Sequence, residues 1–141
     1  MIEWYKKVVF ENYGNFKGRA RRSEYWYFRL ASTIIFLLFV VLGVIIYAAT
    51  DNGPLALGLA YGLLMLYALG TMIPSLAVSV RRMHDIGKSG WTILVAMIPL
   101  VGPIWILVLL FTEGDSGENY YGNDPKNEIE EINEIGNVEL Q

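Results

Sequence analysis

Two clusters of charged residues contain the side chains with which this chain could do chemistry. The first cluster reads F-K-G-R-A-R-R-S-E-Y-W over residues 16–26, and the second reads R-R-M-H-D-I-G-K-S-G-W over residues 81–91. The forked donors of arginine fit phosphate and carboxylate groups. The two clusters therefore predict a site for an anion or for the headgroup of an anionic lipid. The candidate residues are Arg19, Arg21, Arg22, Arg81, Arg82, His84 and Lys88.

The same clusters contain residues that suit helix ends and charge pairing. Ser23 is a suitable N-cap, which would place Glu24 in a first turn where negative charge is favourable. Asp85 is spaced to pair with Arg81 or Arg82 on a helix. The residues expected to pair charges or cap helices are Ser23, Glu24, Asp85, Gly87 and Ser89. These roles leave a surplus of positive charge, which either anchoring to anionic lipid or a dedicated anion pocket would explain.

An enzyme is a poor match to these residues. His84, Asp85 and Ser89 include the residue types of a hydrolytic triad, but neighbouring side chains on a helix diverge by about 100° and cannot form its linked hydrogen bonds. One histidine and one aspartate also make a thin metal site, and the chain has no cysteine. We therefore expect a protein that is not an enzyme, with no metal and no cofactor. A membrane enzyme that uses His84 and Asp85 is the minor alternative.

The elements that position the two clusters are long apolar segments. The chain has 141 residues, of which 54% are apolar and 18% charged, whereas soluble domains have about 45–50% and about 25%. Residues 30–80 contain a single charge, Asp51, and residues 89–112 contain none. A helix of about 20 apolar residues crosses a bilayer once. We predict an all-α integral membrane protein with three transmembrane helices, over residues 30–50, 55–80 and 90–112.

The basic residues predict the orientation of these helices. Cytoplasmic segments carry an excess of lysine and arginine. Three crossings with the N-terminus in the cytoplasm would place ten of the eleven basic residues inside. The third crossing is interrupted by Pro99 and by Gly102-Pro103, so a re-entrant pair of half-helices is the alternative. In that case the C-terminal tail would also be cytoplasmic, and it could meet the two basic clusters.

The N-terminus has the pattern of a helix that lies on the membrane surface. Residues 3–13 can place Trp4, Tyr5 and Val8 toward lipid and their charged residues toward headgroups. We therefore expect an N-terminal interfacial amphipathic helix. It would be part of a single membrane domain over residues 1–125, followed by an acidic tail over residues 126–141.

Small residues four apart in the second segment let helix backbones approach closely. Gly58 and Gly62 have this spacing. We expect them to pack against another helix of the same chain, with self-association as the alternative.

Four motifs in order carry a family resemblance. They are F-x-G-R-A-R-R-S-E-Y-W, S-L-A-V-S-V-R-R-M-H-D-I-G-K-S-G-W, I-P-L-V-G and G-E-N-Y-Y-G-N-D-P. Together they resemble the bacterial family called domain of unknown function 805, whose members are small inner-membrane proteins, and the resemblance covers residues 4–125. Members often carry a basic residue where this chain has Tyr120. The resemblance implies no established activity.

These observations lead to one expected function and one alternative. We expect a multi-pass protein of the bacterial inner membrane that acts as a binding or assembly module. Its basic cytoplasmic face would bind anionic lipid or an acidic partner, and a protein partner or a second copy is possible. Nucleic acid is not expected, because the basic residues alternate with aromatic residues typical of membrane interfaces. The alternative is a component of an oligomeric transporter or channel for small solutes.

Overall fold

The computed structural model describes residues 1–49 and 53–126, and the acidic tail after Lys126 lies outside the described residues. Within these ranges all the regular secondary structure is helical, apart from one isolated β-bridge between Asn119 and Gly122. The elements are α1 (Ile2–Lys6), a π-helical turn η1 (Lys7–Glu11), α2 (Arg22–Ala49), α3 (Gly53–Asp85), a 3-10 helix η2 (Gly90–Met97) and α4 (Val101–Phe111). The all-helical class predicted from the sequence is therefore confirmed.

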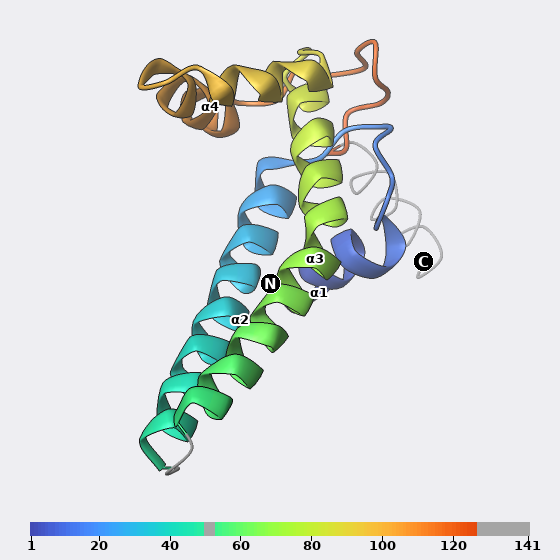
Figure 1. Cartoon of the computed structure of the whole chain (residues 1–141). Coiled ribbons are helices and arrows are strands. Elements are labelled where there is room, and N and C mark those ends of the chain that lie inside the picture. The colour runs from blue at the N-terminus through green and yellow to red at the C-terminus, as the bar shows by residue number, and fades with distance from the viewer. Residues whose placement is uncertain (50–52, 127–141) are drawn as a thin grey trace, which may run out of the picture.

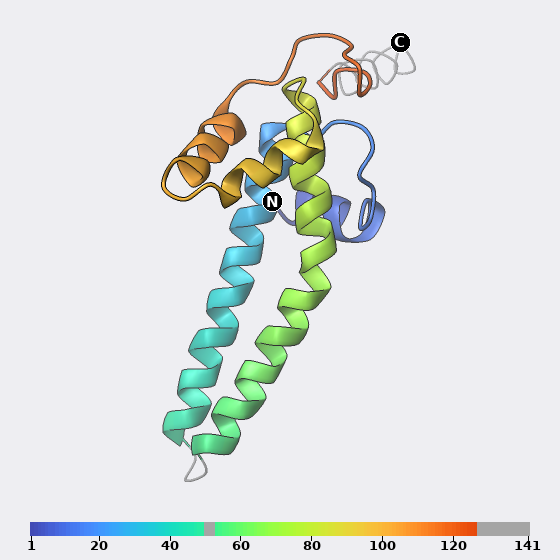
Figure 2. The same cartoon turned by 45° about the horizontal axis from the view of Figure 1, so that its top comes forward.

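Helices α2 and α3 form a long antiparallel hairpin that dominates the molecule (Figures 1 and 2). They are 28 and 33 residues long, and both are long and apolar enough to cross a membrane. Large apolar side chains face outward along the pair, including Leu38 and Leu66, which are 63% and 68% exposed. Such a surface suits lipid and would be unfavourable in water.

A glycine on α2 allows the two helices to approach closely. A Cβ atom built on Gly43 would lie 2.7 Å from Cβ of Ala60 on α3. The residues predicted to pack within the chain, Gly58 and Gly62, have nothing within 4 Å of such an atom. The prediction that Gly58 and Gly62 pack against another helix of the same chain is therefore wrong. The close approach between α2 and α3 is at Gly43 and Ala60 instead.

The N-terminal helix packs against the hairpin. Val8 is fully buried, and the ring of Tyr5 stacks on Phe28 of α2 with their centroids 5.7 Å apart. The expectation that Tyr5 and Val8 face lipid is wrong, because residues 12–21 turn the chain back so that α1 packs against α2 and η1 against α3 (Figure 1). Val8 joins Tyr25, Phe28, Val78 and Met83 in the buried core of the molecule.

The third predicted crossing is not confirmed. Residues 90–111 form two short helices of 8 and 11 residues, η2 and α4, which fold back on each other. Leu100 has a φ of 68° at the turn, and a Cβ atom on Gly102 would overlap the carbonyl oxygen of Val95. The glycine thus permits the tight return, and Pro103 suits an early position in α4. This second hairpin projects sideways from the end of α3 (Figures 1 and 2).

The end of α3 turns sharply into η2. Gly87 has a φ of 66°, and the N–H groups of Gly87 and Lys88 donate to the carbonyl oxygens of His84 and Met83. This pattern is the Schellman motif, in which glycine adopts the left-handed conformation after a helix. Ser89 then precedes η2, and its side chain accepts a hydrogen bond from Trp91 N–H. At the start of α2, Ser23 is not the expected N-cap but the second residue of the helix.

Candidate functional site

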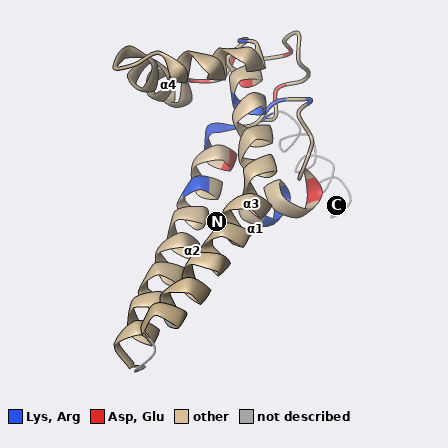
Figure 3. Ribbon diagram, viewed as in Figure 1, with Lys and Arg blue, Asp and Glu red and all other residues tan. Residues whose placement is uncertain are grey.

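Charged residues gather where α2 begins and α3 ends, while the described residues in the opposite half of the hairpin carry no charge (Figure 3). Three segments far apart in the sequence meet there: the loop before α2, the last turn of α3, and residues 112–126 after α4. Residues 112–126 are termed the C-terminal loop below. The two basic clusters and the last motif of the sequence therefore form one site, as the re-entrant alternative predicted.

Asp85 lies at the centre of this site and is buried. Its Oδ1 accepts a hydrogen bond from Arg19 Nε at 3.1 Å, and its Oδ2 accepts one from Arg82 Nη1. Its backbone carbonyl oxygen accepts a hydrogen bond from Asp115 N–H at 2.8 Å. A Cβ atom on Gly114 would overlap the Asp85 carboxylate, so the glycine is what lets the C-terminal loop come this close.

Arg19 binds the C-terminal loop through its carbonyl oxygens. Its Nη1 donates to Gly117 at 2.5 Å and to Gly122 at 3.3 Å, and its Nη2 donates to Asp115. With the bond to Asp85, every nitrogen of the guanidinium has a partner. Burial of a charge is tolerable when it is paired and fully hydrogen-bonded. Arg19 therefore attaches the C-terminal loop to the end of α3.

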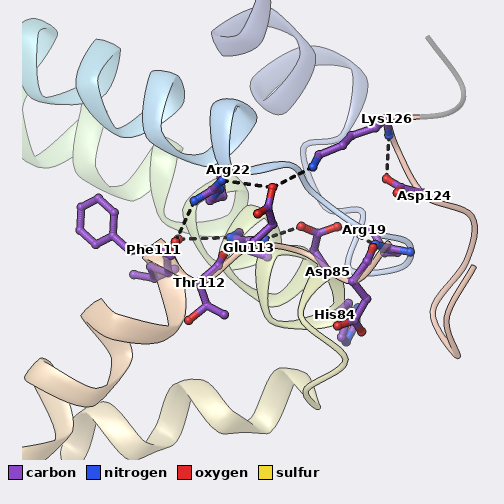
Figure 4. Close-up of polar contacts among 12 residues, drawn as sticks. Arg19, Arg22, His84, Asp85, Phe111, Thr112, Glu113, Asp124 and Lys126 are labelled. Carbon is purple, nitrogen blue, oxygen red and sulfur yellow. Dashed lines mark hydrogen bonds and ion pairs between the residues drawn. The ribbon is translucent and has the colours of Figure 1, made fainter. Parts of the chain in front are cut away.

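Two further arginines bind the C-terminal end of α4, and Figure 4 shows Arg22 beside Phe111 and Glu113. Arg82 donates to the carbonyl oxygens of Leu110, at 3.3 Å, and of Thr112. Arg22 donates to the carbonyl oxygen of Phe111 at 3.0 Å and pairs with Glu113 at 3.4 Å. The last carbonyl groups of a helix lack partners within it and carry partial negative charge. Both arginines therefore supply donors that the end of α4 needs.

Arg81 and Glu24 join α3 to α2. Arg81 Nη1 lies 2.7 Å from Glu24 Oε1, and both side chains are almost completely buried. Lys7 Nζ approaches the other carboxylate oxygen of Glu24 at 3.7 Å. Glu24 thus links the N-terminal helix, α2 and α3 at one point.

His84 is held in place on two sides. Its Nδ1 donates to the carbonyl oxygen of Gly18 at 3.1 Å, and its ring stacks on Tyr121 with centroids 3.9 Å apart and planes 3° from parallel. Its backbone carbonyl accepts a hydrogen bond from Asn119 Nδ2 at 3.0 Å. Within the C-terminal loop, Asn119 and Gly122 exchange backbone hydrogen bonds. His84 therefore connects the loop before α2 to the C-terminal loop.

Acidic residues of the C-terminal loop are stabilised in their charged form. The hydrogen bond and charge of Lys126, with the charge of Arg22, lower the pKa of Glu113. Burial alone would raise the pKa of Asp124, but hydrogen bonds from the backbone N–H groups of Lys126 and Gly117 and the charge of Arg19 outweigh it and lower that pKa. Both carboxylates are consequently ionised at neutral pH.

The predicted anion-binding residues fall into two groups. Arg19, Arg22 and Arg82 donate hydrogen bonds to other groups of the protein, Arg81 binds Glu24 through Nη1, and His84 is engaged through Nδ1. Arg21 and Lys88 form no ion pair with another described residue. Tyr121 and Asp124 were not among the predicted site residues, although both lie in the last of the four sequence motifs. Residue types alone could not reveal that the main partners of the arginines are backbone carbonyl groups.

A polar cavity of about 260 Å³ opens beside Asp85. Arg21, Arg22 and Lys126 line it together with Asp85, Asp115 and Asp124. The opposite charges there balance one another, so this cavity does not favour an anion or a cation. Among the described residues, no group of three or more histidine, aspartate or glutamate side chains could hold a metal ion.

Comparison with known proteins places these residues in a family. Residues 13–123 match the family described as "Protein of unknown function (DUF805)". The chain is 44% identical over 125 residues to the inner membrane protein YhaI of Escherichia coli strain K12, which covers 89% of this chain and 97% of YhaI. It is 37% identical over 127 residues to the inner membrane protein YhaH of the same strain, which covers 89% of this chain and 98% of YhaH. No solved structure matches the chain.

Proposed function

Because this chain belongs to the DUF805 family of proteins of unknown function, and its relatives YhaI and YhaH are inner membrane proteins, we propose that it is an inner-membrane binding or assembly module with a basic cytoplasmic face. The observation that carries this proposal is the meeting of both basic clusters and the C-terminal loop at one end of the α2/α3 hairpin. The physical case has three parts: topology, free positive charge and the engagement of His84 and Asp85.

The topology that fits the structure has two crossings. Residues 30–49 of α2 and 53–72 of α3 are uncharged, and each run spans about 30 Å as a helix, the thickness of the hydrocarbon core. The N-terminal helix and the C-terminal loop then lie on the same side. All eleven lysine and arginine residues fall on that side, which agrees with a cytoplasmic location better than the ten of eleven given by three crossings.

The η2/α4 hairpin has the length and the surface of a segment that lies in the membrane interface. Its tip is strongly apolar, and Met97 and Leu100 are 78% and 87% exposed. Helices this short cannot cross a bilayer. An apolar hairpin that leaves the end of α3 sideways can instead lie in the headgroup region or enter the membrane from one side.

The free positive charge suits anionic lipid. Arg21 and Lys88 lie at the cytoplasmic end of the hairpin and pair with no described residue. Anionic lipid attracts each basic residue near the surface by about 1 kcal/mol.

A binding role also fits the chemistry of His84 and Asp85 better than catalysis. His84 donates through Nδ1 to a backbone carbonyl, and two buried arginines engage the Asp85 carboxylate. Burial raises the pKa of Asp85, and the charges of Arg82 and Arg19 oppose that rise. Both oxygens of the carboxylate already accept hydrogen bonds from these arginines, so the group is not presented to a substrate. The contacts of His84 and Asp85 instead hold separate segments of the chain together.

The test uses the full chain in neutral detergent, titrated with short-chain phosphatidylglycerol and, for comparison, phosphatidylcholine. We expect tighter binding of the anionic lipid, and the Arg21→Gln/Lys88→Gln double variant should weaken it by roughly tenfold to thirtyfold. Lys126→Gln is the matched control, because Lys126 already pairs with Glu113. Equal affinity for both lipids, or no effect of the double variant, would refute a role in lipid binding.

A further inference from the structure

Arg81 has a buried hydrogen-bonding edge that the described protein does not use. The residue is 3% exposed. Its Nη1 binds Glu24, but its Nε and Nη2 are buried without a hydrogen-bond partner among the described residues. Native structures pair buried donors almost without exception, and an unsatisfied donor on a charged group is especially costly. The two free N–H groups of Arg81 therefore require an acceptor.

A cavity next to Arg81 has the charge to supply that acceptor from outside the chain. Its volume is about 280 Å³. The described residues that line it include four cations, Lys7, Lys17, Arg19 and Arg81, and no acidic residue. Three asparagines add amide groups that can donate hydrogen bonds, Asn12, Asn15 and Asn123. The cavity beside Asp85, in contrast, contains three carboxylates.

The nearby acids do not cancel this charge. Glu24 is shared between Arg81 and Lys7, and Asp85 is shared between Arg19 and Arg82. Lys17 forms no ion pair with a described residue. Asp124 also lies close enough for the charge of Arg19 to lower its pKa. Three carboxylates therefore face five cations, including Arg82, and the surplus of two positive charges is what a dianion would offset.

The arrangement of the two free donors of Arg81 indicates which class of anion fits the cavity. Nε and Nη2 share one edge of the planar guanidinium and can bind two oxygens of one group side by side. A phosphate monoester carries up to two negative charges and three terminal oxygens. Two oxygens can face the Arg81 edge, and the third can face Lys7 or Lys17. A carboxylate has too few oxygens and too little charge to use all these donors.

We infer that the cavity between the loop before α2, the end of α3 and the C-terminal loop is a binding site for a phosphate monoester, with the Nε/Nη2 edge of Arg81 as its central donor. The inference deepens the proposed function and rests on it, because it gives the basic face a specific ligand chemistry. The phosphate can belong to a lipid headgroup or to a soluble ester, and both present the same group.

The experiment measures binding of two probes to the full chain in neutral detergent at constant ionic strength. Inorganic phosphate represents the soluble source, and short-chain phosphatidic acid represents the lipid source. Phosphatidylglycerol, a phosphate diester, is the comparison lipid. We expect saturable binding of inorganic phosphate, of phosphatidic acid, or of both, because each presents three terminal phosphate oxygens. Binding of inorganic phosphate identifies a soluble ligand, and binding of phosphatidic acid alone identifies a lipid.

Variants locate the binding. Arg81→Lys keeps a charge for Glu24 but removes the paired edge, so affinity should fall by about tenfold or more. Lys17→Gln and Asn123→Asp change exposed residues at the cavity, which keeps the test valid if Arg81→Lys does not fold. Lys17→Gln should weaken binding by about threefold to tenfold, and Asn123→Asp should weaken it at least as much. Lys126→Gln, outside the cavity and at a residue that pairs with Glu113, should leave it unchanged.

Two results would overturn the inference. One is that neither inorganic phosphate nor phosphatidic acid binds. The other is binding that Lys17→Gln and Asn123→Asp leave unchanged, since the Arg81 edge would then bind only water. If phosphatidylglycerol still bound in a manner sensitive to Arg21 and Lys88, the proposed function would stand without this site. If no anionic probe bound at all, both would fail.

Discussion

The hydroxyl group of Tyr13 donates a hydrogen bond to the backbone carbonyl oxygen of Gly70, at a distance of 2.8 Å. Pro74 lies four residues after Gly70 within α3 and has no N–H group to donate to that carbonyl. The loop after η1 therefore satisfies the carbonyl that the proline leaves without a partner. This bond attaches the N-terminal segment to the middle of α3.

The first prediction concerns this bond. Tyr13→Phe should destabilise the protein by about 1 kcal/mol, because it removes the hydroxyl donor and leaves Gly70 unsatisfied. In a Pro74→Ala background the cost should be smaller, since the backbone N–H that alanine restores can bind the same carbonyl. Thermal unfolding of the four proteins in detergent gives the coupling energy. Equal costs of Tyr13→Phe in both backgrounds would contradict this account.

The second prediction concerns the central carboxylate. Asp85→Asn should destabilise the protein by about 3–5 kcal/mol, because it leaves the buried guanidinium groups of Arg19 and Arg82 without their counter-charge. It should also release the C-terminal loop, which Arg19 binds, and limited proteolysis after residue 112 would detect this. Glu113→Gln is the control, since that side chain is 66% exposed and the substitution should change stability far less than Asp85→Asn does. A similar loss of stability in both variants would show that Asp85 is not the residue that holds the charged site together.

The third prediction compares two glycines of the long hairpin. Gly43→Val should destabilise the α2/α3 pair by about 1–3 kcal/mol, because the added atoms overlap Ala60. Gly62→Val should change the stability of the monomer much less, since nothing lies within 4 Å of its Cβ position. Unfolding in detergent measures both. A loss of oligomers in Gly62→Val with no loss of monomer stability would assign Gly62 to self-association, the alternative from the sequence.

Some of this structure could be predicted from the sequence, and the reasons for the failures are physical. The first two apolar segments are continuous, so length and composition suffice to find their helices. The third segment is equally apolar, but hydropathy does not report continuity. Leu100 and Gly102 form a reversal there that only backbone geometry reveals. The sequence therefore favoured a crossing where the chain folds back.

The same limit applies to the site. Counting charges showed that the two clusters have a surplus of arginine, and proximity of the C-terminal loop followed only from the re-entrant alternative. The partners of Arg19 and Arg82 are chiefly carbonyl oxygens, for example of Gly117 and Leu110. Every residue has a backbone carbonyl, so residue types contain no signal for such contacts. For this reason the sequence could not distinguish an arginine such as Arg19, whose donors are all used within the protein, from Arg81. The Nε and Nη2 atoms of Arg81 have no partner among the described residues.

The fourth prediction tests the number of crossings. The chain has no cysteine, so single cysteines can be introduced without a background. Two crossings predict that Pro54→Cys reacts with a membrane-impermeant maleimide added outside the inner membrane, whereas Asn123→Cys reacts only after the membrane is opened. Three crossings would place both positions outside. Labelling of Asn123→Cys in intact spheroplasts would therefore refute the two-crossing topology.

The last prediction is a pH dependence of the C-terminal loop. The pKa of Asp124 is lowered from its ordinary value of 3.8 by its hydrogen bonds in the folded protein, despite burial. A carboxylate with a lowered folded-state pKa stabilises the fold above its unfolded-state pKa, and this contribution disappears as the pH falls through the folded-state value. The lowered pKa of Glu113 acts in the same direction.

Attachment of the loop by these two residues should therefore be constant from neutral pH down to about pH 5 and weaken below about pH 4. A fluorophore on Asn123→Cys would report the change as a fall in anisotropy. Asp124→Asn is the control, because it removes the hydrogen-bonded carboxylate and should lower anisotropy at neutral pH and flatten the acid transition. A transition above pH 5 in the parent protein would contradict the role given to Asp124 and would point instead to a group such as His84, whose pKa burial lowers from 6.5.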